Sequence, residues 1–289
     1  MPPTVRLGVN TWIWASPLTT DVLEALLPTV LEVGAEHLEI ALEVPDLLDS
    51  ARAASLLSGS GLSVSVCAAI GPDRDLIHPD RGVRENAANY LRCCIETTAA
   101  LGGRNLVGPL YSAVGRVWSM TRAEREADTA LLVEQLKKLA TYAAEHGVTL
   151  CLEPLNRFET SFINLTSQAL EVVQRVNHPA LGLMLDTFHM NIEERSLGQA
   201  ITLAGPWLKH LHACENDRGA PGSGHVPWLE VKAALGHIGF DGPVVIESFT
   251  DQVRSIARAA AIWRPLAESQ DALARDGLHF LRGLLRPSN

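Results

Sequence analysis

Short aliphatic runs alternate with longer amphipathic stretches along most of the chain. The short runs predict strands at 5–12, 37–42, 63–69, 105–110, 149–155, 181–186, 208–214 and 243–249. Apolar residues at helical spacing predict helices at 18–34, 46–59, 80–102, 121–146, 166–177, 193–204, 228–238 and 251–262. Strands that alternate with helices build parallel sheets, so eight such units predict an α/β fold that closes into a (β/α)8 TIM barrel.

Glycines mark two of the predicted boundaries. Gly147 and Gly239 each follow a helical pattern and precede a strand, the position where a helix commonly ends in glycine. Residues 263–289 predict an extra C-terminal helix beyond the eighth unit. No Pro- or Ser-rich linker interrupts the pattern, so we expect one domain spanning residues 1–289.

Composition and charge narrow the class of protein. Of the 289 residues 47% are apolar, and the formal net charge is −9. An acidic surface repels phosphate backbones, so we expect no nucleic-acid partner. Residues 1–10 lack the basic and apolar regions of a signal peptide, and no run of 18 apolar residues predicts a membrane span. The five cysteines form no CxxC pair, which favours reduced thiols and a cytoplasmic location.

Four polar residues stand at the ends of four consecutive predicted strands. They are Glu153, Asp186, His212 and Glu247, separated by 33, 26 and 35 residues, each about one strand–helix unit. In a TIM barrel the chemistry is located where the strands end, so these side chains should meet at one site. The alternative is that some are surface charges or helix caps, and Asp186 in particular precedes a potential short helix.

Three carboxylates in a partly buried site repel one another and lose hydration. A divalent cation removes both costs, and carboxylate-rich ligands with one imidazole favour Mn²⁺, with Mg²⁺ or Co²⁺ as alternatives. Zinc sites contain more His and Cys, so zinc is disfavoured. We therefore predict a metal site formed by Glu153, Asp186, His212 and Glu247.

Other polar residues lie just beyond the same strands. Glu159, His189 and Arg218 are in loops that would surround the barrel mouth, where they are candidates for binding substrate. The alternatives are that Arg218 pairs with Glu215 and that Glu159 is solvated.

Cys67 and Trp118 are further candidates for the substrate pocket, since they end or follow predicted strands. Cysteine also packs well as a small apolar residue, so Cys67 has a structural alternative. Trp118, with Trp12 and Trp14, would form either a wall against the substrate or part of the core.

Two buried candidates are expected to support the site. His210 precedes His212 by two positions and so faces the same side of its strand. We interpret it as an interior histidine behind the site. Glu39 is interpreted as a buried, paired acid below it.

Several segments carry a resemblance to a known family. They are CLEPLNRFE (151–159), LDTFHMNIEE (185–194), HLHACENDR (210–218), PGSGHVPW (221–228) and GFDGPVVIESF (239–249). Together they resemble the D-tagatose 3-epimerase family, which includes D-psicose (D-allulose) and L-ribulose 3-epimerases among the xylose-isomerase-like barrels. The resemblance is densest over 149–249.

The resemblance implies a metal-dependent ketose 3-epimerase that acts on free keto-sugars through a cis-enediolate. It implies that Glu153 and Glu247 are the acid/base pair as well as ligands of the metal, usually Mn²⁺. It also implies that Glu159, His189 and Arg218 contact the sugar, and that the protein is a homodimer or homotetramer.

Alternative functions stay open at this point. A hydroxypyruvate isomerase or inosose dehydratase would keep the metal and both glutamates. An endonuclease IV-type hydrolase would need a His-rich zinc cluster and a basic groove, which the charge disfavours. A sugar-binding protein without catalysis would not need both glutamates.

Overall fold

The computed structural model describes residues 5–286, and eight parallel strands form a closed barrel at its centre. Each strand pairs with the next along the chain, and β8 pairs with β1. This confirms the predicted TIM barrel. The strands are β1 (Leu7–Asn10), β2 (His37–Leu42), β3 (Ser63–Ala68), β4 (Asn105–Gly108), β5 (Thr149–Leu152), β6 (Leu181–Asp186), β7 (Leu208–His212) and β8 (Val244–Ile246).

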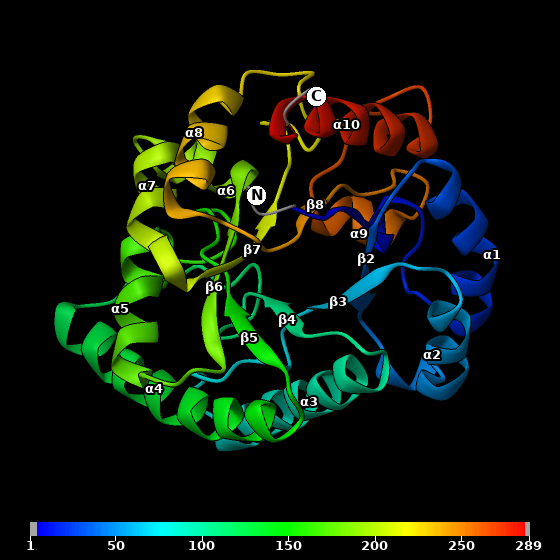
Figure 1. Cartoon of the computed structure of the whole chain (residues 1–289). Coiled ribbons are helices and arrows are strands. Elements are labelled where there is room, and N and C mark those ends of the chain that lie inside the picture. Colours follow the sequence, from blue (N-terminus) through cyan, green and yellow to red (C-terminus); the bar gives the residue numbers. More distant parts are fainter. Residues whose placement is uncertain (1–4, 287–289) are drawn as a thin grey trace.

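Helices form an outer ring around the strands (Figure 1). They are α1 (Thr20–Glu32), α2 (Ser50–Ser58), α3 (Arg81–Ala100), α4 (Arg122–Glu145), α5 (Thr166–Val176), α6 (Thr187–Glu193), α7 (Leu197–Ala204), α8 (Trp228–Ile238), α9 (Arg254–Ala259) and α10 (Gln270–Leu285). Within residues 5–286, no helix combines the length and the apolar character that crossing a bilayer requires.

Local sequence explains where several helices begin and end. Gly147 and Gly239 adopt φ values of 69° and 66° just after α4 and α8, as the glycine pattern predicted. Asp186 accepts a hydrogen bond from the backbone N–H of Phe188 and so caps α6 directly at the end of β6. The helix expected at 193–204 is therefore wrong in its extent, because the chain forms α6 first and then α7.

The predicted C-terminal helix is present as α10, which packs against β1 and α8. Arg282 Nη2 donates to the carbonyl of Gly34 over 2.9 Å, which ties α10 to the turn before β2. The expectation of one domain over 1–289 includes residues 1–4 and 287–289, and these lie outside the described part of the chain.

Side chains that point into the barrel form an apolar group and a polar group. The apolar group contains Ala41, Cys67, Val107, Cys151 and Met184, contributed by five consecutive strands. The polar group is centred on a fully buried carboxylate, Glu39. These buried side chains fill the interior of the barrel, so a substrate can bind only at its mouth.

Candidate active site

The four strand-end residues meet at the mouth of the barrel. Glu153 and Glu247 directly follow β5 and β8, whereas Asp186 and His212 are the last residues of β6 and β7. Each is at most 5% exposed. Potential ligand atoms of Glu153, Asp186 and His212 lie within 4.8 Å of one another, and Glu247 Oε2 lies 3.4 Å from His212 Nδ1.

His212 is held from below by Glu39. The distance from its Nε2 to Glu39 Oε1 is 2.6 Å, and Glu39 also accepts hydrogen bonds from Asn10 and Ser65. His210 Nε2 lies 3.0 Å from the other carboxylate oxygen of Glu39. Both interpretations of the interior pair, Glu39 as a paired acid and His210 as a residue behind the site, therefore agree with the structure.

The free nitrogen of His212 provides a test of whether these residues fit a metal. His212 Nδ1 is buried and makes no well-formed hydrogen bond within residues 5–286, although Glu247 Oε2 lies 3.4 Å away. Histidines that bind metals commonly place their other ring nitrogen against a carboxylate, as Glu39 does here. Burial lowers the pKa of His212, but the charges of Glu39 and Glu247 outweigh it and raise the pKa well above its usual range. A cation would displace that proton, so the donor set fits a divalent metal.

The two glutamates have opposite electrostatic environments. Burial, and then the charge of Glu247, raises the pKa of Glu153 well above its usual range. Burial also acts to raise the pKa of Glu247, but His212 and Arg218 outweigh it and hold that pKa below its usual value. Two carboxyl groups whose pKa values are driven apart are suited to act as acid and base.

Arg218 brings a positive charge among these carboxylates. Its Nη1 donates to Asp186 Oδ2 over 2.5 Å and to Glu247 Oε2 over 2.8 Å. The residue has φ of 68°, a left-handed conformation that costs energy for a side chain of this size and that clusters at functional sites. Its guanidinium does not pair with Glu215, which instead accepts from Trp228 Nε1 and from the backbone of Gly222.

His189 and Glu159 approach the same site through one asparagine. Asn156 Nδ2 lies 2.8 Å from His189 Nδ1 and 2.8 Å from Glu159 Oε1. The other nitrogen of His189, Nε2, lies 3.7 Å from both Glu153 and Asp186. Sequence reasoning missed Asn156, although it lies within the segment CLEPLNRFE that carried the resemblance.

A cavity of ≈ 470 Å³ opens at the mouth and contains most of the predicted site. Cys67, Glu153, Glu159, His189, Arg218 and Glu247 line it, together with apolar side chains that include Trp12 and Phe249. Asp186 and His212 are not among the lining residues, and neither is Trp118. It stacks on Phe162 with ring centroids 6.3 Å apart, and the Arg116 guanidinium lies 3.9 Å from its ring.

The loops that carry these residues are fixed by further contacts. Thr187 Oγ1 donates to the carbonyl of Cys214 over 2.6 Å and accepts from its N–H, which joins the ends of β6 and β7. Asp75 binds Arg116 and the backbone of Ala113, which joins the loops after β3 and β4. The mouth is thus held in place before any ligand binds.

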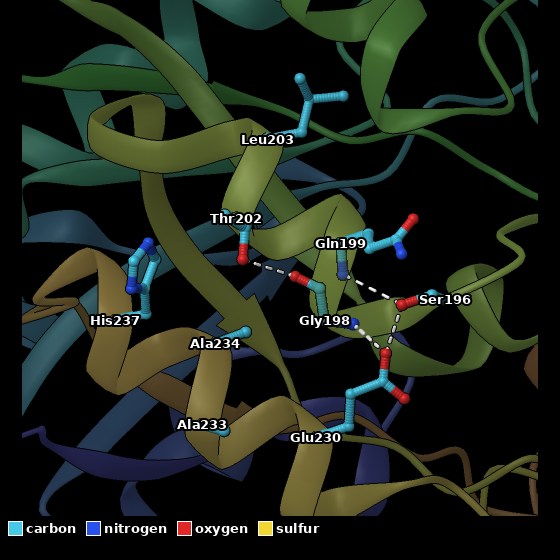
Figure 2. Close-up of a pocket in the computed structure, with 9 residues that line it drawn as sticks. All are labelled: Ser196, Gly198, Gln199, Thr202, Leu203, Glu230, Ala233, Ala234 and His237. Atoms are coloured by element: carbon cyan, nitrogen blue, oxygen red, sulfur yellow. Dashed lines mark hydrogen bonds between the residues drawn. The ribbon is translucent and has the colours of Figure 1, made fainter.

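A larger hollow, of ≈ 680 Å³, lies outside the barrel between α7 and α8. Figure 2 shows that Glu230 reaches across it from α8 to the start of α7. The carboxylate accepts hydrogen bonds from Ser196 Oγ and from the Gly198 N–H. None of the predicted site residues lines this groove, so its size does not make it the active site.

Known proteins resemble this chain along nearly its whole length. The family model described as xylose isomerase-like TIM barrel matches residues 29–284. A D-psicose 3-epimerase from Ruminiclostridium cellulolyticum is 34% identical over 270 residues, 92% of each chain. An L-ribulose 3-epimerase from Methylomonas sp. is 30% identical over 283 residues, 97% of this chain and 98% of the other. A crystal structure of a Methylomonas D-allulose 3-epimerase in complex with D-allulose has a TM-score of 0.91 at 29% identity and covers 98% of both chains.

Proposed function

The chain belongs to the xylose isomerase-like TIM barrel family, and from this premise we propose that it is a ketose 3-epimerase that interconverts free keto-sugars. Its relatives named D-psicose and L-ribulose 3-epimerases are isomerases that act on such sugars. Candidate substrates are therefore D-tagatose, D-psicose, D-fructose and L-ribulose.

One observation carries the proposal. Glu153 and Glu247 follow different strands, β5 and β8, and their side chains line a single cavity. Epimerisation at C3 needs a base that removes the proton on one face and an acid that returns a proton on the other. We assign these roles to the two glutamates, which exchange them in the reverse reaction.

The proposed metal ligands are Glu153, Asp186, His212 through Nδ1, and Glu247. The oxygen-rich donor set supports Mn²⁺, with Mg²⁺ or Co²⁺ as alternatives. When bound, a divalent cation supplies positive charge that polarises the substrate carbonyl and offsets the repulsion between the carboxylates.

Other residues of the chain would hold the sugar. Arg218 Nη2 and His189 Nε2 lie 3.2 Å apart, so both can donate to one oxygen that becomes negative in a cis-enediolate. Glu159 would accept a hydrogen bond from a sugar hydroxyl, and Cys67 would contact the sugar from the apolar wall. Trp118 would act indirectly, by supporting the loop that contains Arg116.

The test is turnover of D-fructose, D-psicose, D-tagatose and L-ribulose in D₂O, with and without a chelator. We expect deuterium at C3 of the product, loss of turnover after chelation, and recovery with Mn²⁺. Hydroxypyruvate and inososes belong in the same assay, because turnover of these compounds alone would assign a related isomerase or dehydratase. Full ketose turnover by protein stripped of all metal would overturn the metal assignment.

Location and assembly are further parts of the proposal. A cytoplasmic location is supported by the five cysteines, all of which are unpaired within residues 5–286. A homodimer or homotetramer is proposed from the family resemblance, and sedimentation equilibrium measures it directly.

A further inference from the structure

One ring nitrogen of His189 faces two hydrogen-bond donors from the same residue. The backbone N–H of Asn156 lies 3.1 Å from His189 Nδ1, and the side-chain Nδ2 lies 2.8 Å from it. A backbone amide can only donate, so Nδ1 must be the acceptor. The proton of a neutral imidazole must then be on Nε2.

The hydrogen-bond network also fixes the orientation of the asparagine amide. Asn156 Oδ1 accepts from the N–H of Phe158 over 2.9 Å, which leaves Nδ2 on the side of His189. The second hydrogen of Nδ2 points to Glu159 Oε1 at 2.8 Å. If the amide oxygen and nitrogen were exchanged, the oxygen would face His189 Nδ1, which is also an acceptor. The Phe158 N–H would then have no acceptor.

Asn156 is suited to this role because its surroundings are rigid. It is 2% exposed, and its carbonyl accepts from the N–H groups of Glu159 and Thr160. The neighbouring Leu155 donates its N–H to Ile163, which closes the loop after β5. A buried, fully bonded amide holds its partners with little freedom.

The other ring nitrogen of His189, Nε2, is a hydrogen-bond donor. With the proton on Nε2, His189 and Arg218 Nη2 are two donors 3.2 Å apart, and neither is an acceptor for the other. The carboxylate oxygens of Glu153 and Asp186 lie 3.7 Å from Nε2, beyond hydrogen-bond distance. An oxygen atom placed between Nε2 and Arg218 Nη2 would accept from both.

We propose that Asn156 is a positioning residue that holds His189 as the neutral Nε2–H tautomer, so that His189 and Arg218 converge on one substrate oxygen. Asn156 also sets Glu159 in the same arrangement, through the second hydrogen of its amide. This inference rests on the proposed function for the identity of that oxygen, but the tautomer itself does not depend on it.

Two substitutions separate this role from a merely structural one. Asn156→Asp has nearly the same shape but places an acceptor against His189 Nδ1, so we expect kcat to fall by about 100-fold. Asn156→Ala removes the side chain but keeps the backbone donor, so we expect a loss of about 10-fold. If Asn156 only filled space, the isosteric Asp would be the milder change, and that order would overturn the proposal.

The matched control is Asn89→Asp, which makes the same change of charge on the exposed surface of α3. Within residues 5–286 the side chain of Asn89 forms one hydrogen bond, which it accepts from Arg92. We expect its kcat and KM to stay within about twofold of the unmodified protein. Thermal unfolding of all three variants checks that each is folded.

A spectroscopic measurement tests the tautomer without turnover. In protein labelled with ¹⁵N at histidine, His189→Gln identifies the His189 signals by their loss. We expect an unprotonated Nδ1 and a protonated Nε2 in the unmodified protein, and a changed pattern in Asn156→Asp. A protonated Nδ1 in the unmodified protein would overturn the proposal. Absence of ketose turnover would instead overturn the proposed function, while the NMR result stands.

Discussion

The barrel mouth and the groove between α7 and α8 each contain a carboxylate, but the two carboxylates differ in their hydrogen-bond partners. In the groove, Glu230 is paired with Ser196 and with the backbone of α7 (Figure 2). At the mouth, Glu153 lies among other acids, and the nearby His212 Nδ1 makes no well-formed hydrogen bond in the described chain.

This difference in partners indicates different roles for the two carboxylates. Buried polar groups normally find partners, so a cluster that leaves some without one indicates a ligand. A satisfied carboxylate at the start of a helix stabilises the fold instead. We therefore assign catalysis to the smaller cavity, at the barrel mouth. The following experiments test this contrast between mouth and groove.

The largest effect is expected at the acid/base pair. Glu153→Gln and Glu247→Gln keep the shape of each side chain but remove its ability to carry the proton, so each should lower kcat by at least about 1,000-fold. Product formation by chromatography measures this, with circular dichroism as the check of folding. Near-normal epimerisation by either variant would exclude the two-base scheme.

A smaller loss of activity is expected one layer below the mouth. Glu39 touches His212 and His210 but does not line the cavity. Glu39→Gln removes the charge that orients His212, so we expect metal affinity and kcat/KM each to fall by about 10- to 100-fold. Titration with Mn²⁺ under assay conditions measures both, and excess metal should restore part of the activity. An unchanged affinity for Mn²⁺ would show that Glu39 does not support the metal site.

Stability should respond to pH through the barrel interior. His37 is buried between Ser63 and Ser65, and burial lowers its pKa from 6.5 to about 3. Below pH 6.5 the histidine is protonated in the unfolded chain but stays neutral in the folded chain. The neutral buried His37 therefore costs no stability above pH 6.5, and the free energy of unfolding decreases as the pH falls from 6.5 towards 3. The expected contribution is about 1.4 kcal/mol per pH unit in that interval.

Denaturant unfolding between pH 5 and 7.5 measures this dependence. His37→Gln should show a shallower decrease on the acid side than the unmodified protein. His237→Gln, which changes an exposed histidine of the groove, is the control and should leave the slope unchanged. Equal slopes for all three proteins would mean that His37 does not carry the effect.

Sequence pattern was sufficient for the barrel and for which residues meet at its mouth. Strand ends in a closed parallel barrel share one rim, so spacing alone brought Glu153, Asp186, His212 and Glu247 together. The prediction needed only the order of the strands, because topology then fixes where each strand ends. It did not need the loops.

Residues that depend on loop conformation could not be found in this way. Asn156 reaches from the loop after β5 to His189 in α6, and no periodic pattern encodes that contact. Trp118 turns towards Phe162 and not into the cavity, because the loop around Arg116 is bound to Asp75. The split between α6 and α7 depends on Asp186, which both ends a strand and caps a helix.

The smallest effect on activity is expected in the groove. Glu230→Gln keeps an acceptor for Ser196 and Gly198 but loses the charge at the start of α7, so the free energy of unfolding should fall by about 1 kcal/mol. Because the groove lies outside the barrel, kcat/KM should change by less than about twofold. Glu134→Gln, at an exposed pair with Lys138, is the matched control for loss of one surface charge. A tenfold loss of activity in Glu230→Gln alone would show that the larger hollow is coupled to the chemistry, and the contrast between the two cavities would then fail.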